Sequence, residues 1–313
     1  METWLQPALP AMTDQQFADW QQLIETRTGI DFSQHRPILQ GGLTRRLRQL
    51  DQGANYDAYF DQVTRWPDGL AEWQLLLDHI AVKETSFFRQ PAAFELVRNY
   101  LRKRVANAQT LDLWSVGCAT GEEAYGLAMV ASDIIERIEP RCFLGVLATD
   151  LCSAALQQAR DGCFRAKRLE QIPDALRRRF FVTENEQFYR ASPRLQRRMC
   201  FAQTNLLDIE HLPSMPMDVI FCQNVLVYFR RWRTKQVLDA LVDRLKPGGL
   251  LVVGPGEAAH WQHAALVRTA HQGVTAWLRR IDTQSPKPQD SWKNPRAHSS
   301  SHETVKITQG RGL

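Results

Sequence analysis

The sequence predicts an α/β protein in which an all-helical segment precedes a mostly parallel sheet. Apolar residues recur at helical spacing early in the chain, and no strand pattern occurs before residue 105. From Leu111 onward, short apolar runs alternate with helical patterns, which indicates parallel strands joined by helices. The first run ends in a turn of small residues at 117–121, directly before a helix that begins with Glu122. A strand, a glycine-containing turn and a helix in this order let a ligand approach the backbone closely.

The composition is that of a globular protein with a mild excess of positive charge. Of 313 residues, 44% are hydrophobic, and 39 Lys and Arg stand against 34 Asp and Glu. A net charge of +5 favours an acidic partner, but it is too small to indicate a protein that binds nucleic acid. We therefore expect no nucleic-acid partner, and an enzyme that acts on nucleic acid is only a weaker alternative.

The cysteines and the first residues indicate the compartment. The six cysteines include no C-x-x-C pair and several lie in apolar runs, so we expect free thiols, a reducing compartment and no metal site. The first residues lack the basic start and the apolar run of a signal peptide. No run approaches the roughly 20 apolar residues that cross a bilayer. We expect a cytoplasmic protein with no direct membrane insertion.

Four helical patterns occupy the N-terminal part. Thr13 and Gln16 form a capping box, and the helix that follows ends at Gly29. The second pattern carries three arginines off its apolar face, namely Arg45, Arg46 and Arg48. Such arginines normally form a solvated helix face, and only an acidic helical partner would give them a function.

Two acidic residues at the start of the helix after the turn, Glu122 and Glu123, restrict the ligand. A helix N-terminus favours phosphate, but two carboxylates there would repel it. Carboxylates suit hydroxyl or cationic groups instead, so the pocket fits a nucleoside without a pyrophosphate, and S-adenosylmethionine (SAM) is the candidate. The turn also lacks the G-x-G-x-x-G pattern, which argues against a dehydrogenase.

Polar residues follow the later strands. Asp150 follows the apolar run at 142–149. A carboxylate at the end of this strand can accept hydrogen bonds from the two ribose hydroxyls of a nucleoside. Alternatively, Asp150 is the N-cap of the next helix. The run at 217–222 ends at Gln223 and Asn224. A helix, a Pro-Gly-Gly turn and a further apolar strand then follow, as is common in class I SAM-dependent methyltransferases. Because ligands lie beyond the carboxyl ends of parallel strands, we expect Gly117, Asp150, Asn205 and Asn224 around one crevice.

The chain divides into three parts by composition. We expect a helical domain at 1–88, a catalytic domain at 89–280 and a disordered tail at 281–313 that is polar and poor in aromatic residues. The basic insertion at 162–200 could hold a short antiparallel ribbon.

Several motifs make the chain resemble the CheR-type chemoreceptor glutamate O-methyltransferases. WSVGCATGEEAYGLAM is the most specific of them, and the others are ETSFFR, ATD, NLLD, DVIFCQNVLVYF and LKPGGLLVVG. The resemblance covers residues 13–280. It implies a class I SAM-dependent methyltransferase sheet, an all-helical N-terminal domain and a small inserted β-subdomain.

The resemblance also implies roles for individual residues. Arg89 and Tyr228 would be catalytic. The cofactor-binding residues would be Thr85 and Arg89 at the methionine end, Glu123 and Asp150 at polar groups, Asn205, Leu206 and Asn224 on the adenosine side, and Gln223 through its backbone. A glutamate acceptor has a pKa of about 4.3, so it is already ionised and needs no general base.

The function implied is methyl transfer from SAM to glutamate side chains of chemoreceptors. The partners would be the receptor's cytoplasmic helices, bound by a basic N-terminal domain of a monomer. Three departures from the family, at Lys83, Gln223 and residues 254–257, indicate a divergent chemosensory or pilus pathway. They also leave open a non-catalytic SAM-binding signalling module.

Overall fold

The computed structural model describes residues 11–50, 55–65, 67, 69–211 and 215–281. The predicted tail, apart from Ile281, lies outside this part of the chain. Within the described residues, no helix combines the length and the apolar character needed to cross a bilayer.

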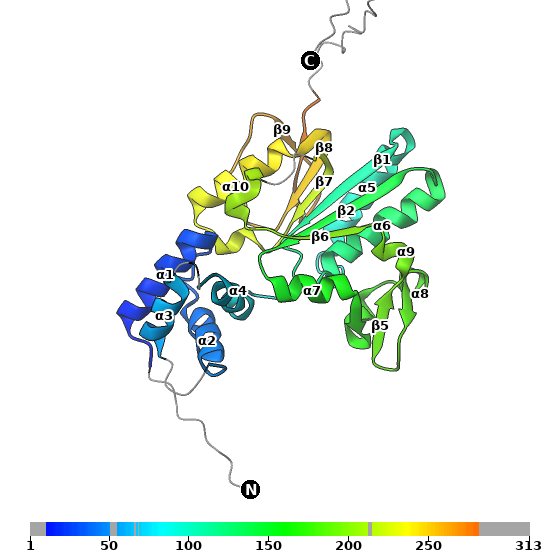
Figure 1. Ribbon diagram of the computed structural model, residues 1–313. Coiled ribbons are helices and arrows are strands. Elements are labelled where there is room, and N and C mark those ends of the chain that lie inside the picture. Colours follow the sequence, from blue (N-terminus) through cyan, green and yellow to red (C-terminus); the bar gives the residue numbers. More distant parts are fainter. Residues whose placement is uncertain (1–10, 51–54, 66, 68, 212–214, 282–313) are drawn as a thin grey trace, which may run out of the picture. The chain divides into compact units, whose positions relative to one another are not determined.

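The described residues of the first part of the structure are helical (Figure 1). The helices are α1 (Asp14–Thr28), α2 (Arg36–Leu47), α3 (Tyr56–Thr64) and α4 (Gly69–Ile80). The predicted capping box is present, because the Thr13 hydroxyl accepts from the Gln16 backbone and the Gln16 side chain accepts from the Thr13 backbone. Gly29 ends α1 with a φ of 77°, which lies in the left-handed region that favours glycine. Buried aromatic and aliphatic side chains on all four helices form a separate core.

The arginines of α2 differ from one another. Arg46 lies over α4, where its Nε and Nη2 donate to the two carboxylate oxygens of Glu72 at 2.7 and 2.8 Å. The Tyr59 hydroxyl donates to the same carboxylate at 2.7 Å. Arg45 donates to the His79 carbonyl oxygen, whereas Arg48 is exposed. Arg46 is therefore an internal partner of Glu72 rather than part of a solvated face.

The expectation of a basic N-terminal domain is wrong. Residues 1–88 contain twelve Asp and Glu but seven basic residues, which are Arg27, Arg36, Arg45, Arg46, Arg48, Arg65 and Lys83. The helical segment is thus acidic, and the positive charge of the chain comes from later residues.

A seven-stranded sheet forms the second part, with the strand order β6-β2-β1-β7-β8-β10-β9. The strands are β1 (Thr110–Val116), β2 (Phe143–Asp150), β6 (Met199–Gln203), β7 (Met217–Cys222), β8 (Leu245–Val253), β9 (Leu266–Arg268) and β10 (Thr275–Arg279). The five strands from β6 to β8 are parallel, and β10 is antiparallel to both its neighbours. The order reverses at β1, so the carboxyl ends of β1 and β7 border a crevice.

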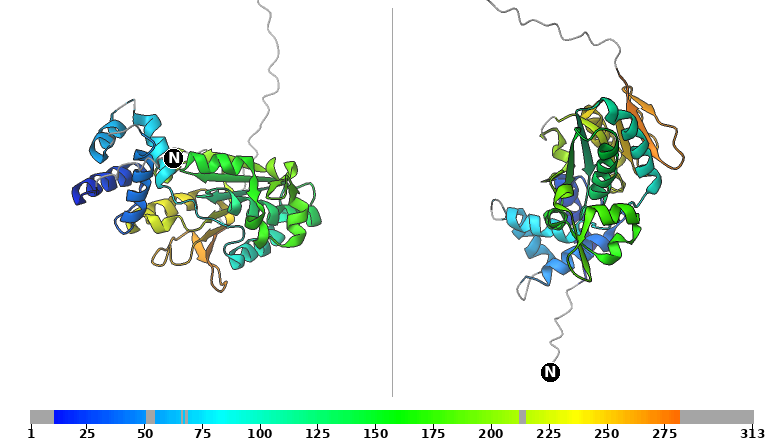
Figure 2. Two further views of the ribbon diagram at one scale, coloured as in Figure 1. Left: turned by 90° about the horizontal axis from the view of Figure 1, so that it is seen from below. Right: turned by 90° about the vertical axis from the view of Figure 1, so that its right-hand side faces the viewer.

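Helices cover both faces of the sheet (Figure 2). On one face, Leu111 and Leu113 of β1 pack in a core with α5 (Pro91–Arg104) and α6 (Glu122–Ile138). On the other, Trp114 and Val116 pack in a core with α10 (Arg231–Asp243). The predicted fold class is confirmed, with one difference in detail. The Pro-Gly-Gly segment was expected to be a turn before the next strand. In the structure it lies within β8, where the pairing with β7 shifts register.

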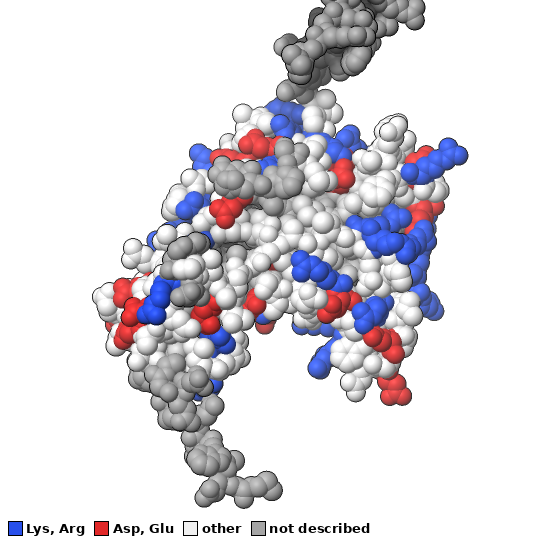
Figure 3. Space-filling view, viewed as in Figure 1, with Lys and Arg blue, Asp and Glu red and all other residues white. Residues whose placement is uncertain are grey.

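The insertion carries its own three-stranded antiparallel sheet in the order β3-β5-β4. Its elements are β3 (Cys163–Arg165), the 3₁₀ helix η2 (Ala166–Gln171), α8 (Asp174–Phe180), β4 (Phe181–Thr183) and β5 (Phe188–Ala191). Lys and Arg gather over the side that holds α8 and α9 (Pro193–Gln196) (Figure 3). Two of these arginines are paired internally, since Arg179 and Arg194 bind Glu136 of α6.

Candidate active site

Two adjoining cavities lie at the carboxyl ends of the parallel strands. One, of about 110 Å³, is lined by Asp150, Asn205, Leu206, Asn224 and Tyr228 among others. The second, of about 260 Å³, is lined by Thr85, Arg89, Glu123, Gln223, Asn224 and Tyr228 among others. The structure thus brings all nine residues predicted for the site to one crevice. Their individual roles remain predictions.

Gly117 stands where β1 ends and borders both cavities. Its φ is 69°, and a Cβ there would lie 2.3 Å from the Cγ2 of Val225. Only glycine fits this approach of the β1 turn to the loop after β7. The close approach brings the two strand ends together and shapes the wall between the cavities.

Asp150 ties the end of β2 to the glycine turn. Its carboxylate accepts the Ala119 N–H at 2.8 Å and the Cys152 N–H at 2.8 Å. Burial raises the pKa of Asp150, against the lowering effect of these hydrogen bonds. The N-cap of α7 (Ser153–Asp161) is Cys152, so the alternative in which Asp150 caps that helix does not hold. Asp150 therefore presents a carboxylate, already oriented by the backbone, to the smaller cavity.

Two residues after β6 shape the same cavity in different ways. The Thr204 hydroxyl is buried and has no hydrogen-bond partner among the described residues. Asn205 is anchored, because its Nδ2 donates to the Arg27 carbonyl oxygen at 2.7 Å and its Oδ1 accepts the Leu207 N–H at 3.1 Å. The unpartnered hydroxyl fits a polar group of a bound nucleoside, since a buried polar atom is normally hydrogen-bonded. Asn205 in turn joins this cavity wall to α1.

The two acids that begin α6 have different surroundings. Glu123 lines the larger cavity and accepts a hydrogen bond from the Ser115 hydroxyl at 2.7 Å. Burial raises the pKa of Glu123 to about 8. Glu122 points elsewhere: it accepts from the Thr120 hydroxyl at 2.6 Å and pairs with Arg168. Of these two acids, only Glu123 lines the larger cavity, where it is placed to receive a cationic group.

Strained backbone collects at this crevice. Among the described residues, the non-glycine residues with positive φ are Phe88 at 53°, Ala119 at 47° and Asn224 at 58°. Ala119 and Asn224 line the larger cavity, and Phe88 precedes Arg89, which also lines it. Such conformations cost about 1–3 kcal/mol each and cluster at functional sites. Their positions agree with a functional role for the crevice and do not depend on any motif.

Glu257 is a residue of the site that the sequence did not identify. Its carboxylate accepts backbone N–H groups from Asn224, Gly254 and Val227 at 3.1, 2.8 and 3.1 Å. These bonds hold the loop that leads from β7 to Tyr228. The only sequence signal was its place at the end of the segment that departs from the family pattern.

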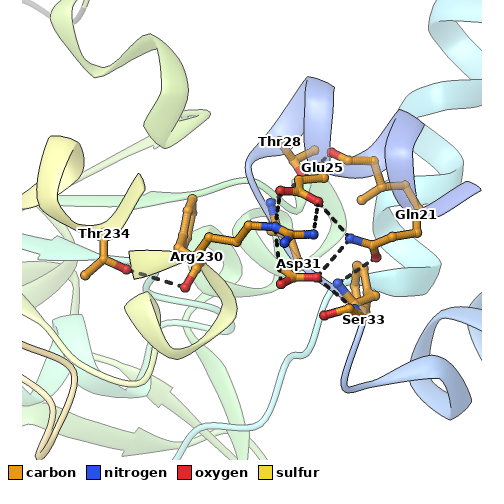
Figure 4. A network of polar contacts seen from close by, with 11 residues as sticks. Gln21, Glu25, Thr28, Asp31, Ser33, Arg230 and Thr234 are labelled. Atoms are coloured by element: carbon orange, nitrogen blue, oxygen red, sulfur yellow. Dashed lines mark hydrogen bonds and ion pairs between the residues drawn. The ribbon is translucent and has the colours of Figure 1, made fainter. Parts of the chain in front are cut away.

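The helical segment also supports this loop. The Asp31 N–H donates to the Tyr228 carbonyl oxygen at 2.7 Å, and Ile30 forms an isolated bridge with Phe229. Arg230 donates to Glu25 of α1 through Nε at 2.5 Å and Nη2 at 2.9 Å, and it pairs with Asp31 at 3.5 Å (Figure 4). The position of Tyr228 thus depends on α1 and the residues that follow it.

A nucleoside with a positively charged end fits these residues. The smaller cavity holds a fixed carboxylate and an unpartnered hydroxyl, and the larger one a buried carboxyl group. The strand order is β6-β2-β1-β7-β8-β10-β9, with β10 antiparallel to its neighbours. This sheet and the two cavities together define a class I SAM-dependent methyltransferase. More particularly, the chain belongs to the CheR methyltransferase family. The family's SAM binding domain matches residues 83–274, and its all-alpha domain matches residues 15–81.

Named relatives agree with this assignment. Chemotaxis protein methyltransferase 2 of Pseudomonas aeruginosa is 31% identical over 277 residues, which cover 85% of this chain and 96% of the relative. Chemotaxis protein methyltransferase of Escherichia coli is 31% identical over 251 residues, covering 79% of this chain and 85% of the relative. The predicted family, enzyme class and cofactor are confirmed.

Proposed function

We propose that this enzyme transfers the methyl group of SAM to glutamate side chains in the cytoplasmic helices of chemoreceptors. The observation that carries the proposal is the meeting of Glu123, Arg89 and Tyr228 around one cavity, since this set can receive a cationic cofactor and an anionic acceptor side by side. The names of the relatives, which are chemotaxis protein methyltransferases, support the same substrate class.

The smaller cavity is the adenosine side in this proposal. Asp150 accepts the ribose hydroxyls, and Asn205, Leu206 and Asn224 line the base. Thr85, Glu123 and the Gln223 backbone hold the methionine end. The Gln223 side chain is itself occupied, because its Nε2 donates to the Gln90 Oε1 at 2.9 Å. When bound, SAM supplies a methyl group on a positively charged sulfur.

The acceptor needs alignment rather than activation. A glutamate with a pKa of about 4.3 is already a carboxylate at neutral pH. No histidine, cysteine or lysine is among the described residues that line the two cavities, and an acceptor that is already ionised requires no base. Alignment of bound groups contributes about 7–11 kcal/mol in favourable cases.

Arg89 and Tyr228 supply that alignment. Arg89 is exposed, and among the described residues its guanidinium makes one hydrogen bond, to the Glu84 carbonyl oxygen at 3.3 Å. The Tyr228 hydroxyl makes none with the described residues and borders both cavities. Arg89 attracts and orients the incoming carboxylate, and Tyr228 donates a hydrogen bond that holds it.

We further propose residues 1–88 and 89–280 as the two domains, with residues 162–200 as the inserted subdomain. The protein acts in the cytoplasm as a monomer and binds no nucleic acid. Receptor helices contact the helical domain beside Arg45 and Arg48, because Arg46 is held by Glu72 and the domain as a whole is acidic.

The test is methyl transfer to purified receptor cytoplasmic domains from the same organism, using SAM labelled in its methyl group. Label in a base-labile ester, with mass spectrometry placing the modification on glutamate, is the expected result. Tyr228→Phe and Arg89→Gln should lower the rate without abolishing binding of S-adenosylhomocysteine (SAH). Binding of SAH without transfer to any cognate receptor would instead favour the non-catalytic signalling module.

A further inference from the structure

Arg168 connects the inserted subdomain to the cofactor pocket. It lies on η2 with half its side chain exposed, and its Nη1 donates to the Thr85 carbonyl oxygen at 2.5 Å. The same nitrogen lies 3.3 Å from the Oε1 of Glu122. One guanidinium therefore contacts both the segment before Arg89 and the first turn of α6.

The partners of Arg168 belong to the walls of the site. Thr85 lines the larger cavity, and Glu122 precedes Glu123, which also lines it. The Glu122 side chain is 1% exposed, and Arg168 is its only ion-pair partner among the described residues. A buried carboxylate depends strongly on such a partner, because without one its charge is uncompensated. Arg168 thus stabilises the glycine turn and Thr85 in one arrangement.

Arg168 stands apart from the other arginines of the insertion. Arg179 and Arg194 bind acidic residues of α6 away from the crevice, and Arg190 binds Glu184 within the insertion. None of the residues described as lining the two cavities belongs to the range 162–200. Any influence of the insertion on the pocket through this contact is therefore indirect.

We propose that Arg168 is a positioning residue that couples the inserted subdomain to the SAM pocket. It holds the Thr85 backbone and Glu122 in the arrangement that binds the cofactor, so cofactor binding in turn restrains the insertion. By thermodynamic linkage, the free energy by which an ordered insertion strengthens cofactor binding equals the free energy by which the bound cofactor stabilises the ordered insertion. The inference rests on the proposed function only for the identity of the ligand.

The experiment compares Arg168→Gln with the wild type and with Arg178→Gln. Arg178 is exposed on α8 and makes no ion pair or side-chain hydrogen bond with the described residues, so it is a matched control. Calorimetry measures SAH binding, and backbone hydrogen exchange follows residues 163–191 with and without SAH. We expect Arg168→Gln to weaken SAH binding about tenfold and to lose most of the SAH-dependent slowing of exchange, with Arg178→Gln unchanged.

Two further variants guard against loss of fold. Arg168→Lys keeps a cation for Glu122 and should recover part of the affinity, whereas Glu122→Gln should reproduce the loss of slowed exchange. SAH affinity and exchange slowing equal to the wild type in Arg168→Gln would overturn the proposal, and so would a lowered melting temperature with both readouts intact. Normal SAH coupling without receptor methylation would count against the proposed function alone.

Discussion

The carboxylate of Glu257 accepts the backbone N–H of Asn224 at 3.1 Å, and it thereby holds a residue whose φ is 58°. The same carboxylate accepts two more backbone N–H groups, from Gly254 and Val227. Three bonds to one half-buried acid stabilise the loop that carries Tyr228. Glu257 is therefore a positioning residue for the proposed reaction.

Glu257→Gln should lower the rate of methyl transfer more than it lowers SAH affinity. The amide offers one oxygen and one NH₂ group, so at least one backbone N–H of the loop would face another donor. A displacement of about 1 Å at Tyr228 reduces rates up to about a hundredfold. Single-turnover transfer and SAH calorimetry on the same preparation measure the two effects. An unchanged rate would show that the loop keeps its shape without the three bonds.

Asp150→Asn should weaken SAH binding by about tenfold to a hundredfold, because a hydrogen bond to a charged acceptor contributes about 1.5–3 kcal/mol. Calorimetry measures the affinity. Asp208→Asn is the control, since Asp208 is exposed and its side chain makes no hydrogen bond with the described residues. The melting temperature without ligand must be followed as well, because Asp150 also holds Ala119 and Cys152. If Asp150→Asn bound SAH as tightly as the wild type, Asp150 would not bind the ribose hydroxyls.

The stability of the ligand-free enzyme should fall as the pH rises towards 8, and Glu123→Gln should reduce that fall. The pKa of Glu123 is raised by burial to about 8, against about 4.3 in an unfolded chain. Between these values the folded protein binds more protons than the unfolded chain, so its free energy of unfolding decreases with increasing pH.

Urea unfolding at several pH values measures this difference. The stability gained by Glu123→Gln relative to the wild type should increase up to about pH 8 and then level off. Exposed Glu186 supplies the control Glu186→Gln, for which no such trend is expected. Curves for Glu123→Gln and the wild type that run parallel over the whole range would mean that Glu123 is ionised throughout.

Arg46→Ala should destabilise the protein by about 2–3 kcal/mol, less than for a deeply buried ion pair because Arg46 reaches the surface. The loss arises because Glu72 would keep a largely buried carboxylate without its cation. Arg48→Ala, on the same helix, should leave stability within about 0.5 kcal/mol. Denaturant unfolding tests both, and receptor binding by calorimetry then tests Arg48 for docking. If Arg46→Ala and Arg48→Ala both had equally small effects on stability, Arg46 would be part of a solvated helix face, as the sequence predicted.

Local patterns predicted much of the fold, and the resemblance to the CheR-type family supplied most of the residues expected in the site. The capping box at Thr13, the helix end at Gly29 and the strand before Gly117 each depend on neighbouring residues, which the sequence displays directly. Asp150 and Asn224 were predicted to meet because the carboxyl ends of parallel strands share one edge of a sheet. A short antiparallel ribbon was expected in the insertion, and the structure has a three-stranded antiparallel sheet there, with internal ion pairs that were not expected.

The sequence by itself determined the order of helices and strands and the residues at the strand ends, because hydrophobic periodicity and turn chemistry act over a few neighbouring positions. Only the tertiary structure decided which distant side chains meet: Arg46 with Glu72, Asn205 with Arg27, Arg168 with Glu122, and Glu257 with the loop before Tyr228. The physical reason is that the sequence does not show whether the charge of an arginine or a glutamate is solvated by water or paired with another residue. Its partner is chosen by the packing of helices and strands far apart in the chain.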